Sequence, residues 1–141
     1  MHRNIRKRNS SFFSLFLIVK MILKTIAVIL VYFINLKLYN IEVATTMSFL
    51  TLILLEMIFT YSCRNLKKNI IGKNLFSNKY MNRGMLILGI IQIIIFVTPF
   101  KNIFKIIDLT LFQVVYCFIV VMLIFLIDEL SKNIINKLFK D

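Results

Sequence analysis

The sequence predicts an all-α, polytopic membrane protein with four transmembrane helices. Of its 141 residues, 60% are hydrophobic and the mean hydropathy is +0.86, so a soluble domain of this size would be unable to hide its apolar surface. Three glycines and one proline leave few helix breakers, which favours helices as the membrane-spanning elements. The apolar residues fall into four runs, and short basic clusters separate them.

The first predicted span, residues 14–36, follows a basic segment, residues 1–13. A basic segment before an apolar one is also typical of a secretory signal peptide. Lys20 and Lys24 interrupt the apolar run, however, and no small-residue cleavage site follows, so we expect a retained span. The two lysines lie one helical turn apart near its beginning, and we expect their ammonium groups to snorkel towards the near interface.

The second predicted span, residues 44–62, contains a single charge, Glu56. As a helix it is about 28 Å long, which is close to the hydrocarbon thickness of a bilayer. A carboxylate in the middle of a span costs roughly 2.5–3.5 kcal/mol on insertion, and each strongly apolar residue returns roughly 0.3–0.6 kcal/mol. Eight such apolar residues lie in the span, so we expect it to insert with Glu56 inside the membrane.

One stripe along this second helix is richer in small and polar residues than the rest of its surface. Its members recur at spacings of three or four and are Thr45, Ser48, Leu52, Glu56, Thr60 and Cys63. Such stripes pack against other helices in membranes, so we expect this face, and Glu56 with it, to be buried between helices. Charged groups inside a membrane are functional by default, which makes Glu56 a candidate ion or proton ligand. The alternative is a packing carboxyl group, protonated or hydrogen-bonded to a serine or threonine.

The third predicted span covers residues 84–100. Thr98 and Pro99 close it, because proline resists continuing a helix. Within the span we expect Gln92 to form an interhelical hydrogen bond and not to bind a ligand. Residues 101–108 are then a short outer loop.

The fourth predicted span covers residues 109–127 and leads into a charged helical extension, residues 128–141. Asp128 and Lys132 are four residues apart in this extension. Opposite charges at that spacing face each other on a helix, so we expect an ion pair between them.

The distribution of charge predicts the topology. The net charge of +12 is typical of nucleic-acid-binding proteins, but here the charges sit in short clusters between apolar runs, which excludes that class. Thirteen lysines and arginines lie in the two termini and the middle loop, against three in the two other loops. We therefore expect both termini in the cytoplasm and one multi-pass domain, residues 1–141, in the bilayer of the cell membrane.

No motif in the chain predicts catalysis or a cofactor. Nucleotide-binding glycine motifs and nucleophile elbows are absent, and three glycines exclude a phosphate cradle. The chain has no zinc-ligand spacing, and Cys63 and Cys117 fall at different depths, so we expect free thiols. Glu56 is the one candidate metal ligand. A single carboxylate cannot hold calcium, which takes six to eight oxygens, so we expect no tight binding by the chain alone.

Five segments resemble, in order and spacing, the seventh to tenth transmembrane helices of calcium-translocating P-type ATPases. They are residues 9–16 (NSSFFSLF), Ala44 through Glu56 to Cys63-Arg64, residues 75–79 (LFSNK), Pro99 with Ile103-Phe104, and Asp128-Glu129-Leu130 with Lys132. The resemblance extends from about residue 4 to residue 138. Thr45 stands where the family usually has arginine, and Val114 where tryptophan is common.

The resemblance implies four helices packed beside an ion pathway, with Glu56 contributing to one calcium site. The family's phosphorylated segment, its nucleotide domain and its fourth to sixth helices carry ATP hydrolysis and most calcium ligands, and the sequence contains none of them. We therefore interpret the chain as the C-terminal transmembrane subdomain of a cation pump, a fragment or split-gene part. Its expected partner is the remainder of a P-type ATPase, and we expect no ATPase activity of its own.

Two other classes of function compete with this interpretation. A small four-helix secondary transporter would use Glu56 for proton coupling. Such exporters carry their essential glutamate in the first span, where this chain has lysines and no acid. A membrane scaffold or regulator without transport is the remaining class.

Overall fold

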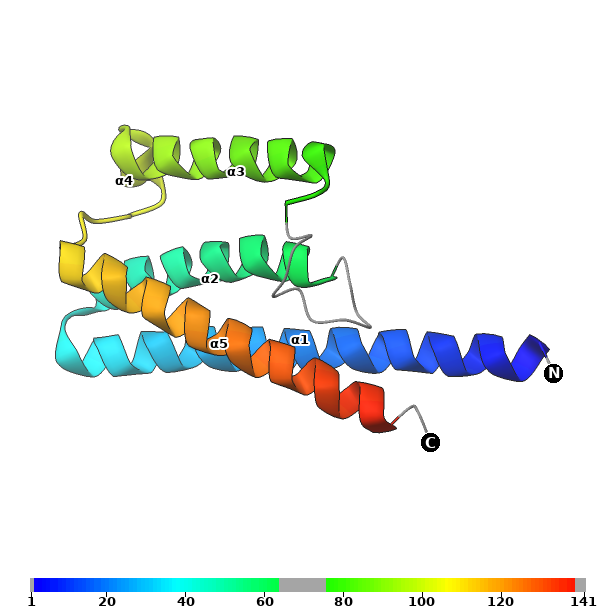
Figure 1. Cartoon of the computed structure of the whole chain (residues 1–141). Coiled ribbons are helices and arrows are strands. Elements are labelled where there is room, and N and C mark those ends of the chain that lie inside the picture. Colours follow the sequence, from blue (N-terminus) through cyan, green and yellow to red (C-terminus); the bar gives the residue numbers. More distant parts are fainter. Residues whose placement is uncertain (1, 64–75, 139–141) are drawn as a thin grey trace.

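The computed structural model describes residues 2–63 and 76–138, with side chains from Ser10 onward. Its elements are α1 (His2–Leu38), α2 (Ile41–Cys63), α3 (Lys79–Val97), α4 (Phe100–Ile103) and α5 (Leu111–Leu138), as Figure 1 shows. Within the described ranges four helical stretches are long and apolar enough to cross a membrane: Ser10–Leu38, Ile41–Cys63, Lys79–Val97 and Leu111–Leu138. The predicted all-α class and the four spans are confirmed.

The helix ends differ from the ends of the predicted spans, and the start of the third helix has a clear local cause. This helix begins at Lys79 and not at residue 84. The reason is the side chain of Asn78, which accepts hydrogen bonds from the backbone N–H groups of Tyr80 and Met81 at 3.1 and 3.2 Å. An asparagine in this position satisfies donors that the first helical turn leaves unpaired. The helix ends at Val97, just before Pro99, and the short α4 follows.

The last predicted span and the described part of its charged extension, residues 128–138, form one continuous helix, α5, which begins at Leu111, two residues after the predicted position. The first two helices begin before the predicted positions, residues 14 and 44. The apolar runs mark the part of each helix that membrane interior requires, whereas the helical backbone continues into the polar flanks.

Helices α1, α2 and α5 form the core of the molecule, and α3 lies to one side of α2 (Figure 1). One cluster of buried residues in this core joins all three helices and consists of Ala27, Leu55, Phe59 and Val121. A second cluster nearer the α1–α2 turn consists of Val31, Val43, Met47 and Cys117. Along the whole of α3, by contrast, Met85 is the single buried residue. The outer surfaces of these helices are apolar, as expected for contact with lipid.

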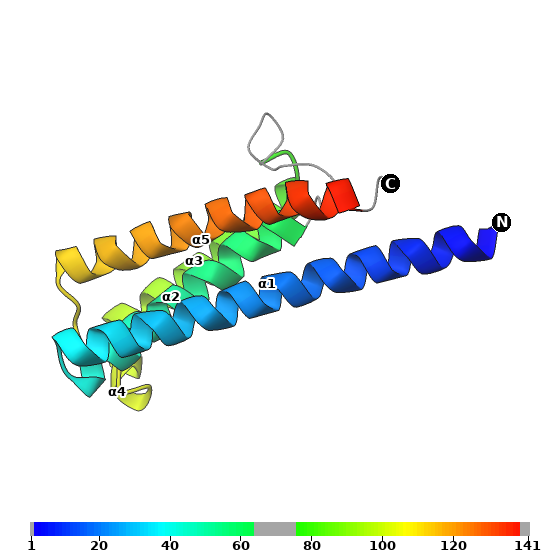
Figure 2. The same cartoon turned by 90° about the horizontal axis from the view of Figure 1, so that it is seen from below.

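The beginning of α1 and the end of α5 lie at the same end of the bundle, and α1 extends beyond the other helices (Figures 1 and 2). This arrangement follows from four spans that alternate in direction. It agrees with both termini lying on one side of a membrane. The assignment of that side to the cytoplasm stays a prediction from the charge distribution.

Candidate functional site

A cluster of buried polar groups joins the three core helices near the end of the bundle that holds the termini. Lys20 of α1 donates hydrogen bonds to Asp128 Oδ2 of α5 and to Ser62 Oγ of α2, both at 2.6 Å. Ser62 Oγ in turn donates to Asp128 Oδ2 at 2.5 Å. Lys20 and Asp128 are 4% and 0% exposed. The Lys20 ammonium also lies 4.9 and 5.0 Å from the ring centres of Phe16 and Phe59, which adds cation–π attraction.

A second ion pair extends this cluster along α5. Lys132 Nζ donates to Glu129 Oε1 at 2.7 Å and to the backbone carbonyl of Ser62 at 3.2 Å. Both side chains are almost fully buried. With Lys20 and Asp128 they make a set of two positive and two negative groups, so the cluster is neutral as a whole. We call these four residues and Ser62 the buried charge cluster.

The cluster corrects two predictions. Lys20 does not snorkel to an interface, because its partner Asp128 meets it inside the bundle. Asp128 and Lys132 do not pair with each other, because Lys132 pairs with Glu129, three residues away. The i,i+4 rule describes an isolated helix. In the bundle, α1 and α2 cover this face of α5, and a buried charge needs a partner with good geometry wherever one lies in space.

One signal for the cluster was present in the sequence. Lys20 and Asp128 are charges at the margins of strongly apolar runs, and such charges need partners. Their pairing was missed because 108 positions separate them along the chain. Ser62 gave no signal, since a serine at the end of a span is common.

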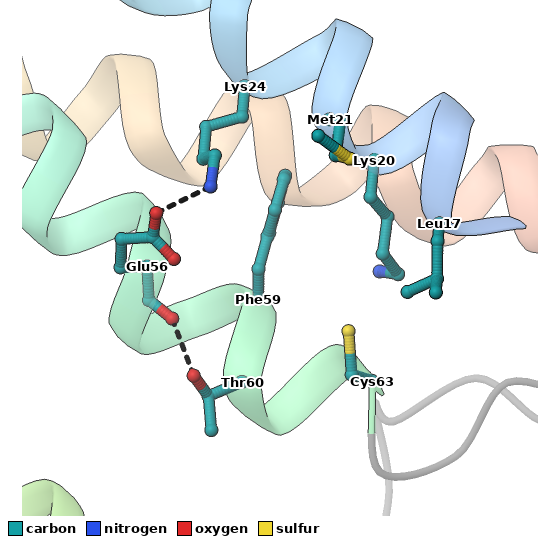
Figure 3. A pocket seen from close by; sticks show the side chains of 8 residues that line it. All are labelled: Leu17, Lys20, Met21, Lys24, Glu56, Phe59, Thr60 and Cys63. Atoms are coloured by element: carbon teal, nitrogen blue, oxygen red, sulfur yellow. Dashed lines mark hydrogen bonds and ion pairs between the residues drawn. The ribbon is translucent and has the colours of Figure 1, made fainter.

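A third ion pair lies about one turn further along α1. Lys24 Nζ is 2.5 Å from Glu56 Oε1, and Figure 3 shows how the two side chains point toward each other. The two side chains are 24% and 58% exposed, so this pair sits at the surface of the bundle and not in its core. Thr60, one turn along α2, donates its hydroxyl to the Glu56 carbonyl oxygen at 2.8 Å. We call Lys24 and Glu56 the surface pair.

The predicted burial of the stripe that contains Glu56 is wrong for this bundle. Of its members Thr45, Glu56, Thr60 and Cys63 are exposed, and Ser48 alone is buried. The buried face of α2 is a neighbouring one, with Ala44, Met47, Ser48, Thr51, Leu55 and Ser62. Two hydroxyl groups on this face bond within α2, because Ser48 and Thr51 donate to carbonyls of their own helix at 2.7 and 2.8 Å, whereas the Ser62 hydroxyl bonds to α1 and α5.

Glu56 borders two pockets, one on each side of α2. The α1–α2 pocket has a volume of about 360 Å³, and Lys20, Lys24 and Cys63 are among its lining residues (Figure 3). The α2–α3 pocket has a volume of about 230 Å³, and Gln92 of α3 lines it together with Glu56. The carboxylate is therefore approachable from the side of α1 and from the side of α3.

The predicted hydrogen bond of Gln92 is not made through its oxygen. Gln92 Oε1 is buried and has no hydrogen-bond partner among the residues that the structure describes. On α2, Glu56 lines the same α2–α3 pocket as Gln92. A carboxylate oxygen of Glu56 and the Oε1 of Gln92 are both acceptors, so they cannot form a hydrogen bond with each other.

The remaining site predictions concern thiols and metals. Cys63 and Cys117 are free, as predicted. In residues 2–63 and 76–138, no group of three or more histidine, cysteine, aspartate or glutamate side chains is placed to hold a metal ion. Within this part of the chain Glu56 thus contributes a carboxylate but not a complete site.

The comparison with protein families gives one match. The family model described as "Cation transporting ATPase, C-terminus" matches residues 1–134. No curated protein and no solved structure matches the chain significantly. The matched description names cation transport without a particular cation, and no catalytic-domain family is found in the chain.

Proposed function

Because the chain belongs to the family of cation-transporting ATPase C-terminal domains, we propose that it forms the last four transmembrane helices of a calcium pump. Its role is to complete the ion pathway with Glu56 after assembly with the parts that hydrolyse ATP. Those parts are not among these 141 residues, and the chain is a fragment or a split-gene part of the pump. The chain by itself hydrolyses no ATP, since it offers no residue set for phosphoryl transfer.

The observation that carries this proposal is the exposure of Glu56. Its side chain is 58% exposed although it lies in the middle of a membrane span. A charged group facing lipid at that depth costs roughly 2.5–3.5 kcal/mol. The surface around Glu56 is therefore suited to contact with further protein or with a water-filled pathway, and the missing helices of a pump supply both.

The composition of the site supports a shared calcium site. Calcium takes six to eight oxygen ligands. Near Glu56 the chain offers two further oxygens. They are the hydroxyl of Thr60 and the Oε1 of Gln92, which has no hydrogen-bond partner among the described residues. These oxygens are too few for tight binding, so most ligands must come from the partner chain. The family match favours this function over a secondary transporter or a scaffold.

The orientation is part of the proposal. The charge asymmetry puts the termini, and the loop around Lys73, in the cytoplasm. Lys73 lies outside the described residues. Lys105 directly follows α4, which lies at the opposite end of the bundle from the termini (Figure 1). A cysteine placed at Lys105, in a background without Cys63 and Cys117, should react with an impermeant reagent from outside intact cells. A cysteine at Lys73 should not react, and the reverse pattern overturns the orientation.

The function is tested by calcium binding after co-expression with a calcium-transporting P-type ATPase whose last four helices are deleted. We expect tight binding only when both chains are present. In the assembly Glu56→Ala should weaken binding at least about tenfold, because it removes the one carboxylate that this chain contributes. Glu42→Ala is the matched control, since Glu42 is an exposed acid in the first turn of the same helix.

Two results contradict the proposal. One is tight calcium binding by the isolated chain, which would mean that no partner is needed. The other is an assembled complex whose calcium affinity is the same for Glu56→Ala and for the unchanged chain.

A further inference from the structure

We propose that Lys24 is a tethered competitor for the cation: its ammonium group occupies the Glu56 carboxylate when no cation is bound and leaves when a cation arrives. This inference rests on the proposed function. It adds that a residue of this chain, Lys24, lowers the cation affinity of the site at Glu56. The competitor is part of α1, so it is always present at the same distance from the site.

The first observation is the contact itself. Lys24 Nζ lies 2.5 Å from Glu56 Oε1, on the α1 side of the carboxylate (Figure 3). At this position the ammonium neutralises a charge that would otherwise be bare in the membrane. The empty site is thereby compatible with a low-dielectric environment without any metal ion.

The second observation is that this lysine is free to leave, whereas its neighbour is not. Among the described residues Lys24 has one hydrogen-bond partner, Glu56, and it is 24% exposed. Lys20 is held by Asp128 and Ser62 and is 4% exposed. Lys24 also borders the α1–α2 pocket of about 360 Å³. The pocket gives its ammonium group room to withdraw without moving a helix.

The third observation is the access from the other side. Glu56 also borders the α2–α3 pocket, which Lys24 does not line. Gln92, whose Oε1 has no partner among the described residues, lines that pocket as well. A cation therefore has a route to the carboxylate that the ammonium group does not block.

Electrostatics makes the two occupants exclusive. An ammonium group and a divalent cation on the same carboxylate repel each other strongly at low dielectric. Cation binding must then displace Lys24, and by linkage Lys24 must weaken cation binding by the same factor. The tether lowers the affinity of the site and balances the charge of Glu56 while no cation is bound.

The test measures equilibrium calcium binding by the co-assembled pump described above, with four forms of this chain. They are the unchanged chain, Lys24→Gln, Glu56→Ala and the double variant. We expect Lys24→Gln to tighten calcium binding at least about fivefold when Glu56 is present. The same substitution should leave the affinity unchanged in the Glu56→Ala background, where the lysine has no carboxylate to occupy.

Two controls distinguish competition by Lys24 at Glu56 from a general effect of positive charge on calcium affinity. Lys24→Arg keeps a cation that pairs with carboxylates and should retain the affinity of the unchanged chain. Lys37→Gln removes a positive charge in the last turn of α1, thirteen positions from Lys24, and should change nothing. As a second measurement, reductive methylation of Lys24 in the unchanged assembly should become faster on addition of calcium, because its amine is then released.

The possible results distinguish the inference from the function on which it rests. Unchanged affinity for Lys24→Gln, together with weaker binding for Glu56→Ala, overturns the tether and leaves the calcium site in place. A gain of affinity that persists in the double variant also overturns the tether, since the effect is then long-range. Binding that never depends on Glu56 overturns the proposed function and the tether with it.

Discussion

Lys20 and Lys24 lie one turn apart on α1 and each contacts a carboxylate, but their surroundings differ. Lys20 meets Asp128 in the core, where α5 crosses α1 and where Ser62 and two aromatic rings complete its contacts. Lys24 meets Glu56 at the surface, beside two pockets. A lysine–carboxylate pair that is buried suits the packing of helices, and we propose that a pair at the surface suits the exchange of partners.

Burial decides the two roles through desolvation. Removing one partner of a buried pair leaves an uncompensated charge and costs about 3–5 kcal/mol, whereas pairs exposed to solvent contribute about 0–1 kcal/mol. The buried charge cluster is therefore expected to hold the helices together. The surface pair is expected to matter little for stability and to be available for function.

The largest effect is expected for Asp128→Ala. This variant leaves Lys20 buried without its carboxylate and should destabilise the folded chain by about 3–5 kcal/mol. Unfolding of the purified chain in lipid or detergent micelles measures the change. Asp108→Ala is the matched control, because Asp108 pairs with Lys101 but is 82% exposed, and its loss should have little effect.

Replacing both partners sharpens the same comparison. Lys20→Met combined with Asp128→Leu removes the charges together, and buried pairs replaced by apolar residues of similar size are often as stable as the original. The double variant should therefore be more stable than Asp128→Ala. If it is equally unstable, packing at this position and not charge accounts for the loss.

An intermediate effect is expected for Ser62→Ala. Ser62 Oγ accepts from Lys20 and donates to Asp128, and its removal leaves two buried charged groups short of a hydrogen bond. The expected loss is about 1–3 kcal/mol in the same unfolding measurement. Ser48→Ala should cost less, because the Ser48 hydroxyl bonds only to a carbonyl of its own helix. Equal losses for the two serines would remove Ser62 from its proposed place in the cluster.

The smallest effect on stability is expected for Lys24→Gln. The surface pair is about a quarter exposed on one side and more than half exposed on the other, and a pair that water reaches, as in the proposed water-filled pathway, contributes about 0–1 kcal/mol. The unfolding transition should stay close to that of the unchanged chain. A loss as large as that of Asp128→Ala would mean that the two pairs do not differ in role.

Much of the fold was predictable because helix formation in a membrane depends on local composition. The four apolar runs, the break at Pro99 and the depth of Glu56 all follow from the order of residues over short distances. Asn78 as a helix start was also readable in principle, since its role depends on the next three residues. The first three helices begin before the predicted starts of their spans, because the helical backbone continues beyond each apolar run.

The sequence by itself determined the class of protein, the number of spans and the presence of a carboxylate, Glu56, well inside the second span. The tertiary structure alone decided which face of α2 is buried and which lysine meets which acid. Neighbouring helical residues differ by roughly 100° around the axis, so the rotation of α2 set by its packing decides that Leu55 and not Glu56 faces the core. The partner of Lys20 lies 108 positions away, and only the packing of α5 against α1 brings it close.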